Sequence, residues 1–141
     1  MKKITLLFIL LSFLNSVQAY DKLSLVERFT NCSCGPCATI NNSWYNATTA
    51  NLINSGSITH VVYNVDWPSP TDPMHILNAI DNNQRRGYYG VSSVPWIDVN
   101  GTTITVSQAA LESAVTSGNA SFSPFIIQII PERFSNDVLN V

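Results

Sequence analysis

Three cysteines, Cys32, Cys34 and Cys37, lie within one short stretch of the 141-residue chain, and the chain has no others. Disulfides that staple a small fold join cysteines that are distant in sequence, whereas these three can tie only local turns. The fold must therefore be held by a hydrophobic core. With 45% hydrophobic and 11% charged residues, the composition is typical of about one globular domain. The cysteine cluster itself indicates a reactive dithiol or a metal site.

The N-terminus has the pattern of a secretory signal peptide. Lys2 and Lys3 precede an apolar run over residues 4–14. Residues 17–19, which end at Ala19, have the small or apolar pattern of a signal-peptidase cleavage site. The run is shorter than the roughly 20 residues that a membrane span needs. We therefore expect cleavage after residue 19, no transmembrane span afterwards, and export to the periplasm, the extracellular space or an outer-membrane-associated location. The net charge is −2, and −4 without the two lysines, so nucleic acid is not an expected partner.

The pattern of apolar and turn residues predicts seven elements in the order β-α-β-α-β-β-α. The second helix begins at an Asp72-Pro73 cap, and Asn100-Gly101 is a strong hairpin signal. Ser107 caps the last helix, and Gly118 is expected to close it. The expected strands cover residues 23–29, 58–65, 96–99 and 102–106, and the expected helices cover residues 36–52, 73–86 and 108–115.

The predicted domain organisation has three parts. Residues 1–19 form the signal peptide, and residues 20–120 form the domain that contains the seven elements. Residues 121–141 form one or more extra strands, or the start of a truncated β module, with a strand over 125–130 followed by a polar turn over 131–137.

The element order resembles that of the thioredoxin-like superfamily. The string Cys34-Gly35-Pro36-Cys37 stands at a strand-to-helix turn, and a proline, Pro95, opens the hairpin strand. Residues 25–30, 67–68, 72–74, 82–83 and 86–91 resemble, more narrowly, exported bacterial thioredoxin-like proteins first described as outer-membrane proteins. The resemblance implies an α/β thioredoxin-like fold, in which helices flank a central mixed sheet, with a trailing C-terminal strand segment.

The same resemblance implies a thiol-disulfide oxidoreductase that acts on protein disulfides. A helix N-terminus stabilises a thiolate, and Cys34 is expected there as the nucleophile, with Cys37 as the resolving thiol. The spacer Gly35-Pro36 matches the reducing members of the superfamily, which favours a reductase or an isomerase. The expected partners are protein dithiols or disulfides and a further redox partner, and the expected redox group is the disulfide itself, without a cofactor.

A cis peptide bond is expected before Pro95, which would leave the main chain of Val94 free to pair with an extended substrate. Thioredoxins carry a buried, proton-moving acid six positions before the nucleophile, and here that position is Arg28. Strand alternation places the neighbouring Glu27 on the opposite face of the sheet. Either Glu27 takes the proton role after a local shift, or no side chain does.

Two other functions are consistent with the same cysteines. Cys32, Cys34, Cys37 and His60 could form a Cu(I) or Zn(II) site, because thiolate and imidazole are suitable ligands for both ions. Alternatively, Cys34 and Cys37 form a structural disulfide in a binding module without catalytic activity. Cys32 is expected to be a free, weakly reactive thiol near the surface, and His75 is expected to be solvated.

Overall fold

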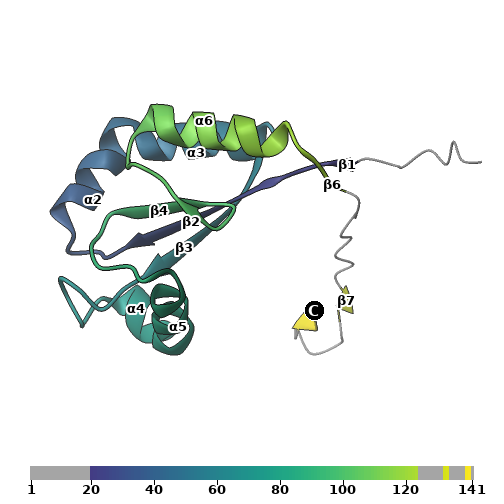
Figure 1. Ribbon diagram of the computed structural model, residues 1–141. Coiled ribbons are helices and arrows are strands. Elements are labelled where there is room, and N and C mark those ends of the chain that lie inside the picture. Colours follow the sequence, from purple (N-terminus) through teal and green to yellow (C-terminus); the bar gives the residue numbers. More distant parts are fainter. Residues whose placement is uncertain (1–19, 124–131, 134–138, 141) are drawn as a thin grey trace, which may run out of the picture. The chain divides into compact units, whose positions relative to one another are not determined.

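The computed structural model describes residues 20–123, 132–133 and 139–140 (Figure 1). The chain divides into two compact units. One is Lys22–Ser121, and the other contains the described residues on either side of it. The expected signal peptide over residues 1–19 and the expected strand over residues 125–130 lie outside the described residues.

A four-stranded mixed sheet forms the centre of the larger unit, with the strand order β3-β2-β4-β5. β2 (Ser24–Thr30) runs parallel to β3 (Ile58–Asn64) and antiparallel to β4 (Trp96–Val99), and β4 forms a hairpin with β5 (Thr102–Thr103). β2 therefore has a hydrogen-bonded neighbour on each edge, and most of its side chains are buried.

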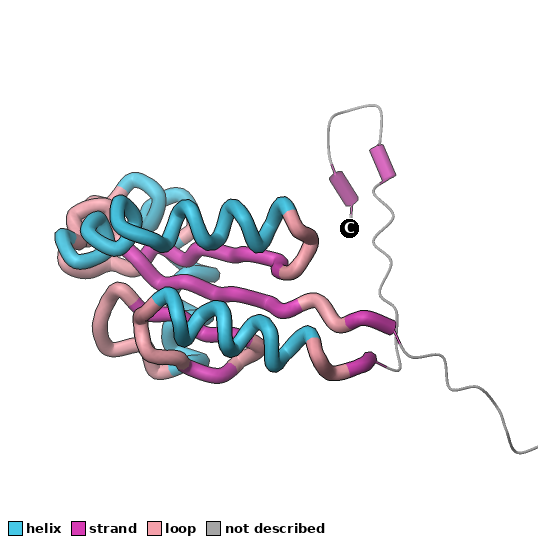
Figure 2. Tube along the Cα trace, turned by 90° about the horizontal axis from the view of Figure 1, so that it is seen from above, coloured by secondary structure: helices cyan, strands magenta, loops and turns pink. Residues whose placement is uncertain are grey.

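One face of the sheet is covered by a long helical stretch and by α6 (Gln108–Asn119), which lie side by side (Figures 1 and 2). The stretch consists of α2 (Gly35–Ile40), the π-helical segment η1 (Asn41–Tyr45) and α3 (Asn46–Asn54). The sequence predicts this helix but not its π-helical part, which begins with the weak helix formers Asn-Asn-Ser. The core on this face consists of Val26, Tyr45, Ile58, Ile97, Val99, Leu111 and Val115.

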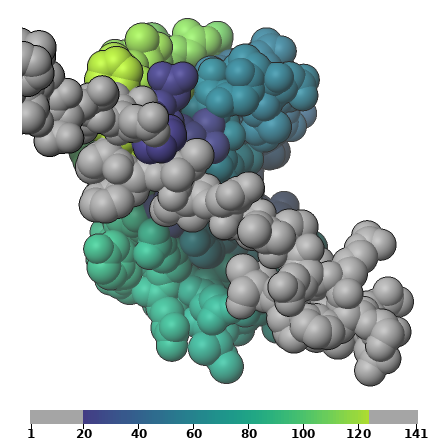
Figure 3. Space-filling model, turned by 90° about the vertical axis from the view of Figure 1, so that its right-hand side faces the viewer, coloured from purple at the N-terminus to yellow at the C-terminus, as the bar shows by residue number. Residues whose placement is uncertain are grey.

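The other face is covered by α4 (Pro73–Leu77) and α5 (Ala79–Tyr89), which are drawn apart from α3 and α6 in Figure 3. Its smaller core consists of Phe29, Val65 and Val91. The prediction of one helix here is wrong, because Asn78 leaves the helical conformation with φ −147° and ψ 49°. Asparagine competes with helix formation through its own local hydrogen bonds, so it is a common point for such a break.

The arrangement is a thioredoxin-like fold, as the sequence predicts. Helices flank a central mixed sheet, and the order β-α-β-α-β-β-α holds from β2 to α6. The predicted Asn-Gly hairpin is also present, since Asn100 and Gly101 adopt positive φ values of 51° and 79° between β4 and β5. Two positive φ values in succession are what a two-residue hairpin turn requires.

Gly118 does not close α6, which continues to Asn119. A Cβ atom at position 118 would lie 2.5 Å from the Ser24 hydroxyl oxygen and 2.5 Å from the Asn100 side-chain nitrogen. Both groups are held in place: the Ser24 hydroxyl donates to the Asn119 side chain at 2.7 Å, and the Asn100 side chain accepts from the Leu25 amide at 3.0 Å. The glycine therefore permits α6 to approach the sheet closely, and it does not terminate the helix.

The second unit contains two short antiparallel strand pairs. β1 (Tyr20–Asp21) pairs with β6 (Phe122–Ser123), and β7 (Glu132–Arg133) pairs with β8 (Leu139–Asn140). The prediction of a polar turn over 131–137 is wrong for residues 132–133, which form β7. Within the part of the chain that the structure describes, no helix is long and apolar enough to cross a membrane.

We predict that Gly118→Ala destabilises the protein by about 1–3 kcal/mol, because the added methyl group overpacks a fixed contact. Gly87→Ala is the matched control, since Gly87 lies within α5 and a Cβ there meets nothing within 4 Å. The control should stabilise by about 0.5–1 kcal/mol through helix propensity. Urea unfolding of both variants measures the difference, and equal effects would contradict the close approach.

Candidate redox site

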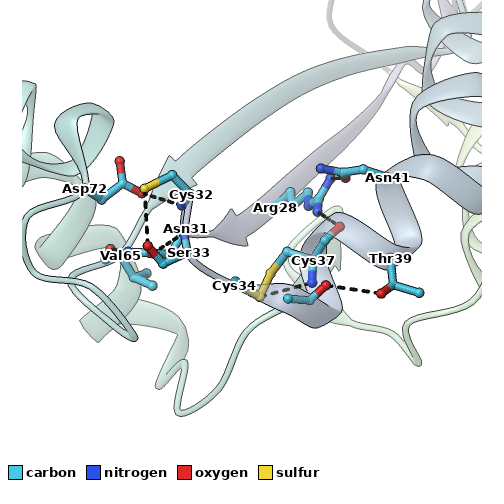
Figure 4. The surroundings of a disulfide bond; sticks show 11 residues. Arg28, Asn31, Cys32, Ser33, Cys34, Cys37, Thr39, Asn41, Val65 and Asp72 are labelled. Atoms are coloured by element: carbon cyan, nitrogen blue, oxygen red, sulfur yellow. Dashed lines mark hydrogen bonds between the residues drawn. A yellow bond between two sulfur atoms is a disulfide. The ribbon is translucent and has the colours of Figure 1, made fainter.

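Cys34 and Cys37 form a disulfide at the start of the long helix (Figure 4). Cys34 is the N-cap of α2, and the Cys37 amide donates to the Cys34 sulfur at 3.1 Å. Pro36 occupies the first turn, where a missing N–H group costs no hydrogen bond. The Cα atoms are 5.2 Å apart, within the range that disulfides require. Both cysteines are buried, at 4% and 1% exposure.

Two buried side chains hold the turn between β2 and this helix. The Asn31 side chain donates to the carbonyls of Val65 and Ser69, at 2.8 and 2.9 Å, and accepts from the Ser33 amide at 2.9 Å. The carboxylate of Asp72 accepts from the Cys32 amide at 2.7 Å and also caps α4. The sequence indicates the cap at Asp72, but no local signal shows that these two residues fix the redox turn.

The hydrogen bonds of Asp72 also determine its ionisation. Burial alone raises the pKa of this carboxyl, but hydrogen bonds from the amides of Cys32, Met74 and His75, together with the Cys32 side chain, outweigh burial and lower the pKa. The turn is therefore held by an ionised carboxylate, and hydrogen bonds to a charged acceptor are stronger than neutral ones.

A hollow of about 200 Å³ opens beside the disulfide. Cys34 and Cys37 both line it, together with the free and exposed Cys32. The remaining lining residues are Thr30, Asn31, Ala38, Asn41 and Asn64.

The peptide bond between Val94 and Pro95 is cis, as the sequence predicts. The next residue, Trp96, pairs with Phe29 near the end of β2, so this loop lies at the same edge of the sheet as the redox turn. Val94 packs against the smaller core. A second cis bond, between Trp67 and Pro68, was not predicted.

Glu27 and Arg28 point to opposite faces of the sheet. Glu27, at 1% exposure, accepts hydrogen bonds from Arg85 at 2.6 Å, from Tyr63 at 3.2 Å and from Tyr89. These contacts lie on the α5 face, away from the disulfide, so the local shift that a proton role for Glu27 requires is not observed. The Arg28 side chain lies on the other face of the sheet, the one that carries the disulfide, and donates to the Cys37 carbonyl at 3.5 Å.

The structure does not bring together the residues of the alternative metal site. Cys34 and Cys37 are bonded to each other, and His60 instead forms a hydrogen bond with the Tyr45 hydroxyl at 2.9 Å. Among the described residues, no group of three or more His, Cys, Asp or Glu side chains is arranged to hold a metal ion. His75 is buried and bonds the Asn64 carbonyl at 2.7 Å, so the prediction that it is solvated is wrong.

No protein-family model and no curated protein matches this chain. A solved structure of tryparedoxin II from C. fasciculata is similar to it, with 14% sequence identity and a TM-score of 0.45. The match covers 74% of this chain and 85% of that one. The assignment of the fold depends on the strand order and connections described above.

Glu27→Gln should lower the free energy of unfolding by about 1–3 kcal/mol at neutral pH, because it leaves Arg85 without its buried partner. Burial raises the pKa of Glu27, but hydrogen bonds from Arg85 and Tyr89, the Arg85 charge and Tyr63 bring it below its ordinary value of 4.5. The stabilisation is thus complete above that value and is lost as the pH falls through the folded-state pKa.

Urea unfolding of wild type and Glu27→Gln between pH 7 and pH 3 measures this dependence. Asp66→Asn is the matched control, because the Asp66–Arg86 pair lies at the surface and should contribute little. A Glu27→Gln effect that stays constant down to the lowest pH would contradict the assignment of Glu27 as an ionised partner.

In the oxidised protein, an alkylating reagent should add once, at Cys32, because the other two cysteines form the disulfide. After reduction, three additions are expected. Mass spectrometry of proteolytic fragments, without reduction, locates the modified residue. Cys32→Ser should abolish the single addition, and a dominant intramolecular bridge that contains Cys32 would contradict the pairing.

Proposed function

We propose that this chain is an exported thiol-disulfide oxidoreductase, of the reductase or isomerase type, that acts on protein disulfides. The observation that carries the proposal is the Cys34–Cys37 disulfide at the start of a helix that continues unbroken to Asn54. The unpaired N–H groups and the positive dipole end of such a helix stabilise a thiolate.

The reaction needs only the two thiols and the substrate disulfide. In the reduced protein, the Cys34 thiolate attacks one substrate sulfur, forms a mixed disulfide and releases the other substrate sulfur as a thiolate. Cys37 then loses its proton to solvent and attacks the Cys34 sulfur, which restores the Cys34–Cys37 disulfide and releases the second substrate thiolate. Two electrons pass from the protein dithiol to the substrate, and a separate dithiol donor must return them.

The geometry supports this division of roles. The Cys37 amide already points at the Cys34 sulfur, where it can stabilise negative charge during attack. Gly35 and Pro36 are exposed beside the hollow and can contact a substrate. In the proposal, the main chain of Val94, before cis Pro95, pairs with the extended substrate segment.

Export is part of the proposal and is supported by the sequence of residues 1–19. It places the protein in the periplasm, outside the cell or at the outer membrane. Disulfides persist in such compartments, so protein disulfides are available there as substrates.

Cys34→Ser should reduce the rate of protein-disulfide reduction to background, because it removes the attacking thiolate. Cys37→Ser should accumulate a mixed disulfide with the substrate, because the resolving thiol is missing. Cys32→Ser is the control and should keep the wild-type rate. The measurements are turnover of a model protein disulfide with dithiothreitol as donor, and non-reducing electrophoresis for the trapped complex.

Equal trapping by the Cys34 and Cys37 variants would contradict the assignment of the nucleophile. A Cys34–Cys37 disulfide that resists mild reductant would favour the non-catalytic binding module. A stoichiometric metal bound to the reduced protein would favour the metal site.

A further inference from the structure

Arg28 is a buried cation without an anionic partner among the described residues. Its exposed fraction is 4%, and it comes from the central strand β2, beside the first turns of the helix that carries the disulfide (Figure 4). The two ion pairs found among the described residues involve Arg85 and Arg86, on the other face of the sheet. Buried charges are ordinarily paired, because the loss of hydration is costly. Arg28 is therefore an exception that needs an explanation.

The groups that surround the guanidinium are neutral. It donates to the Asn41 side-chain oxygen and to the Cys37 carbonyl, and its centre lies 4.1 Å from the Tyr45 ring. The Arg28 Nε–H finds no hydrogen-bond partner within the part of the chain that the structure describes. The neighbouring strands place Val62 and Ile97 opposite Arg28, and neither carries a charge.

The two titratable groups near Arg28 on this face do not supply an anion at neutral pH. Burial raises the pKa of Tyr45 to about 12, although the Arg28 charge acts in the opposite direction. Burial and then the Arg28 charge lower the pKa of His60, so His60 is neutral and adds no second cation. The disulfide is also neutral, and the charge of Arg28 is thus left unbalanced while the cysteines are oxidised.

We propose that Arg28 is the fixed counter-charge for the thiolate that forms when the Cys34–Cys37 disulfide is reduced, and that it shifts the redox equilibrium toward the dithiol. This inference rests on the proposed oxidoreductase function. Arg28 is a positioning residue, since it contacts the cysteines through the Cys37 carbonyl and through Asn41, which lines the hollow beside the disulfide.

A donor dithiol gives two electrons to the disulfide and becomes a disulfide itself, and the Cys34–Cys37 bond breaks. One of the two cysteine sulfurs takes a proton, the other stays a thiolate, and the second proton of the donor goes to solvent. Because Arg28 stabilises the thiolate product but has nothing to stabilise in the disulfide, it favours the reduced protein.

The test compares Arg28→Gln, Arg28→Lys and wild type in equilibrium with glutathione redox buffers. Arg28→Gln should shift the equilibrium about tenfold or more toward the disulfide, since an opposite charge nearby lowers a pKa by about 1–3. Arg28→Lys keeps the charge and should stay within about threefold of wild type. Arg86→Gln, which removes an arginine from the other face, is the control and should match wild type.

Thiolate absorbance in the reduced proteins gives an independent readout as the pH is raised. In wild type, one thiol should have a pKa below the ordinary value of about 8.5 for cysteine. In Arg28→Gln that pKa should rise by about one or more. A purely structural role for Arg28 would change the stability of the protein and leave both the equilibrium and the thiolate titration unchanged.

The outcomes separate this inference from the proposed function. A folded Arg28→Gln protein with the wild-type equilibrium overturns the inference and leaves the oxidoreductase proposal intact. If that variant does not fold, circular dichroism will show it, and the wild-type titration then decides: pKa values of about 8.5 or above for all three thiols overturn the inference. A Cys34–Cys37 pair that no glutathione buffer reduces reversibly overturns the proposed function itself.

Discussion

The structure depends on one constraint, the burial of β2 on both faces of the sheet. Glu27 and Arg28 are adjacent in this strand, so alternation places their opposite charges in two separate cores. On the α5 face, the Glu27 carboxylate accepts hydrogen bonds from Arg85 and Tyr89, which are four residues apart on one helix. The other face offers Arg28 only neutral partners, although they are spaced in the same way along η1. One of the two buried charges is balanced, and the unbalanced one lies beside the disulfide.

The turn that follows β2 connects this buried strand to the disulfide, and two buried side chains fix it. Asn31 ties the turn to the end of β3 through the Val65 carbonyl, and Asp72 ties it to the start of α4 through the Cys32 amide. Both side chains are buried, so water does not compete for these hydrogen bonds. The position of Cys34 is consequently set by the end of β3 and by the start of α4. This explains why a short loop can present the disulfide at a defined edge.

The features predicted correctly from sequence have short-range causes. The Asn100-Gly101 turn and the Asp72 cap are encoded in two adjacent residues each, and the structure contains both. One of the errors arises where distant segments meet. Gly118 is a glycine because Ser24 and Asn100 lie against it, and neither is close in sequence. At the redox site, the spacing of the cysteines indicated the disulfide, whereas the surroundings of Arg28 depend on a helix whose π-helical turn has no clear sequence signal.

In our proposal, one buried residue affects the redox equilibrium without being part of the surface that contacts substrates. The Gly35-Pro36 spacer is exposed and resembles that of reducing proteins, which favours the disulfide form. Arg28 is buried and, in our proposal, favours the dithiol form. Because a buried residue touches no substrate, a change at position 28 alters the redox equilibrium without altering the docking surface. In our proposal, the exposed spacer and the Val94–Pro95 loop contact the substrate, so Arg28 is the part of the site that can change the redox equilibrium alone.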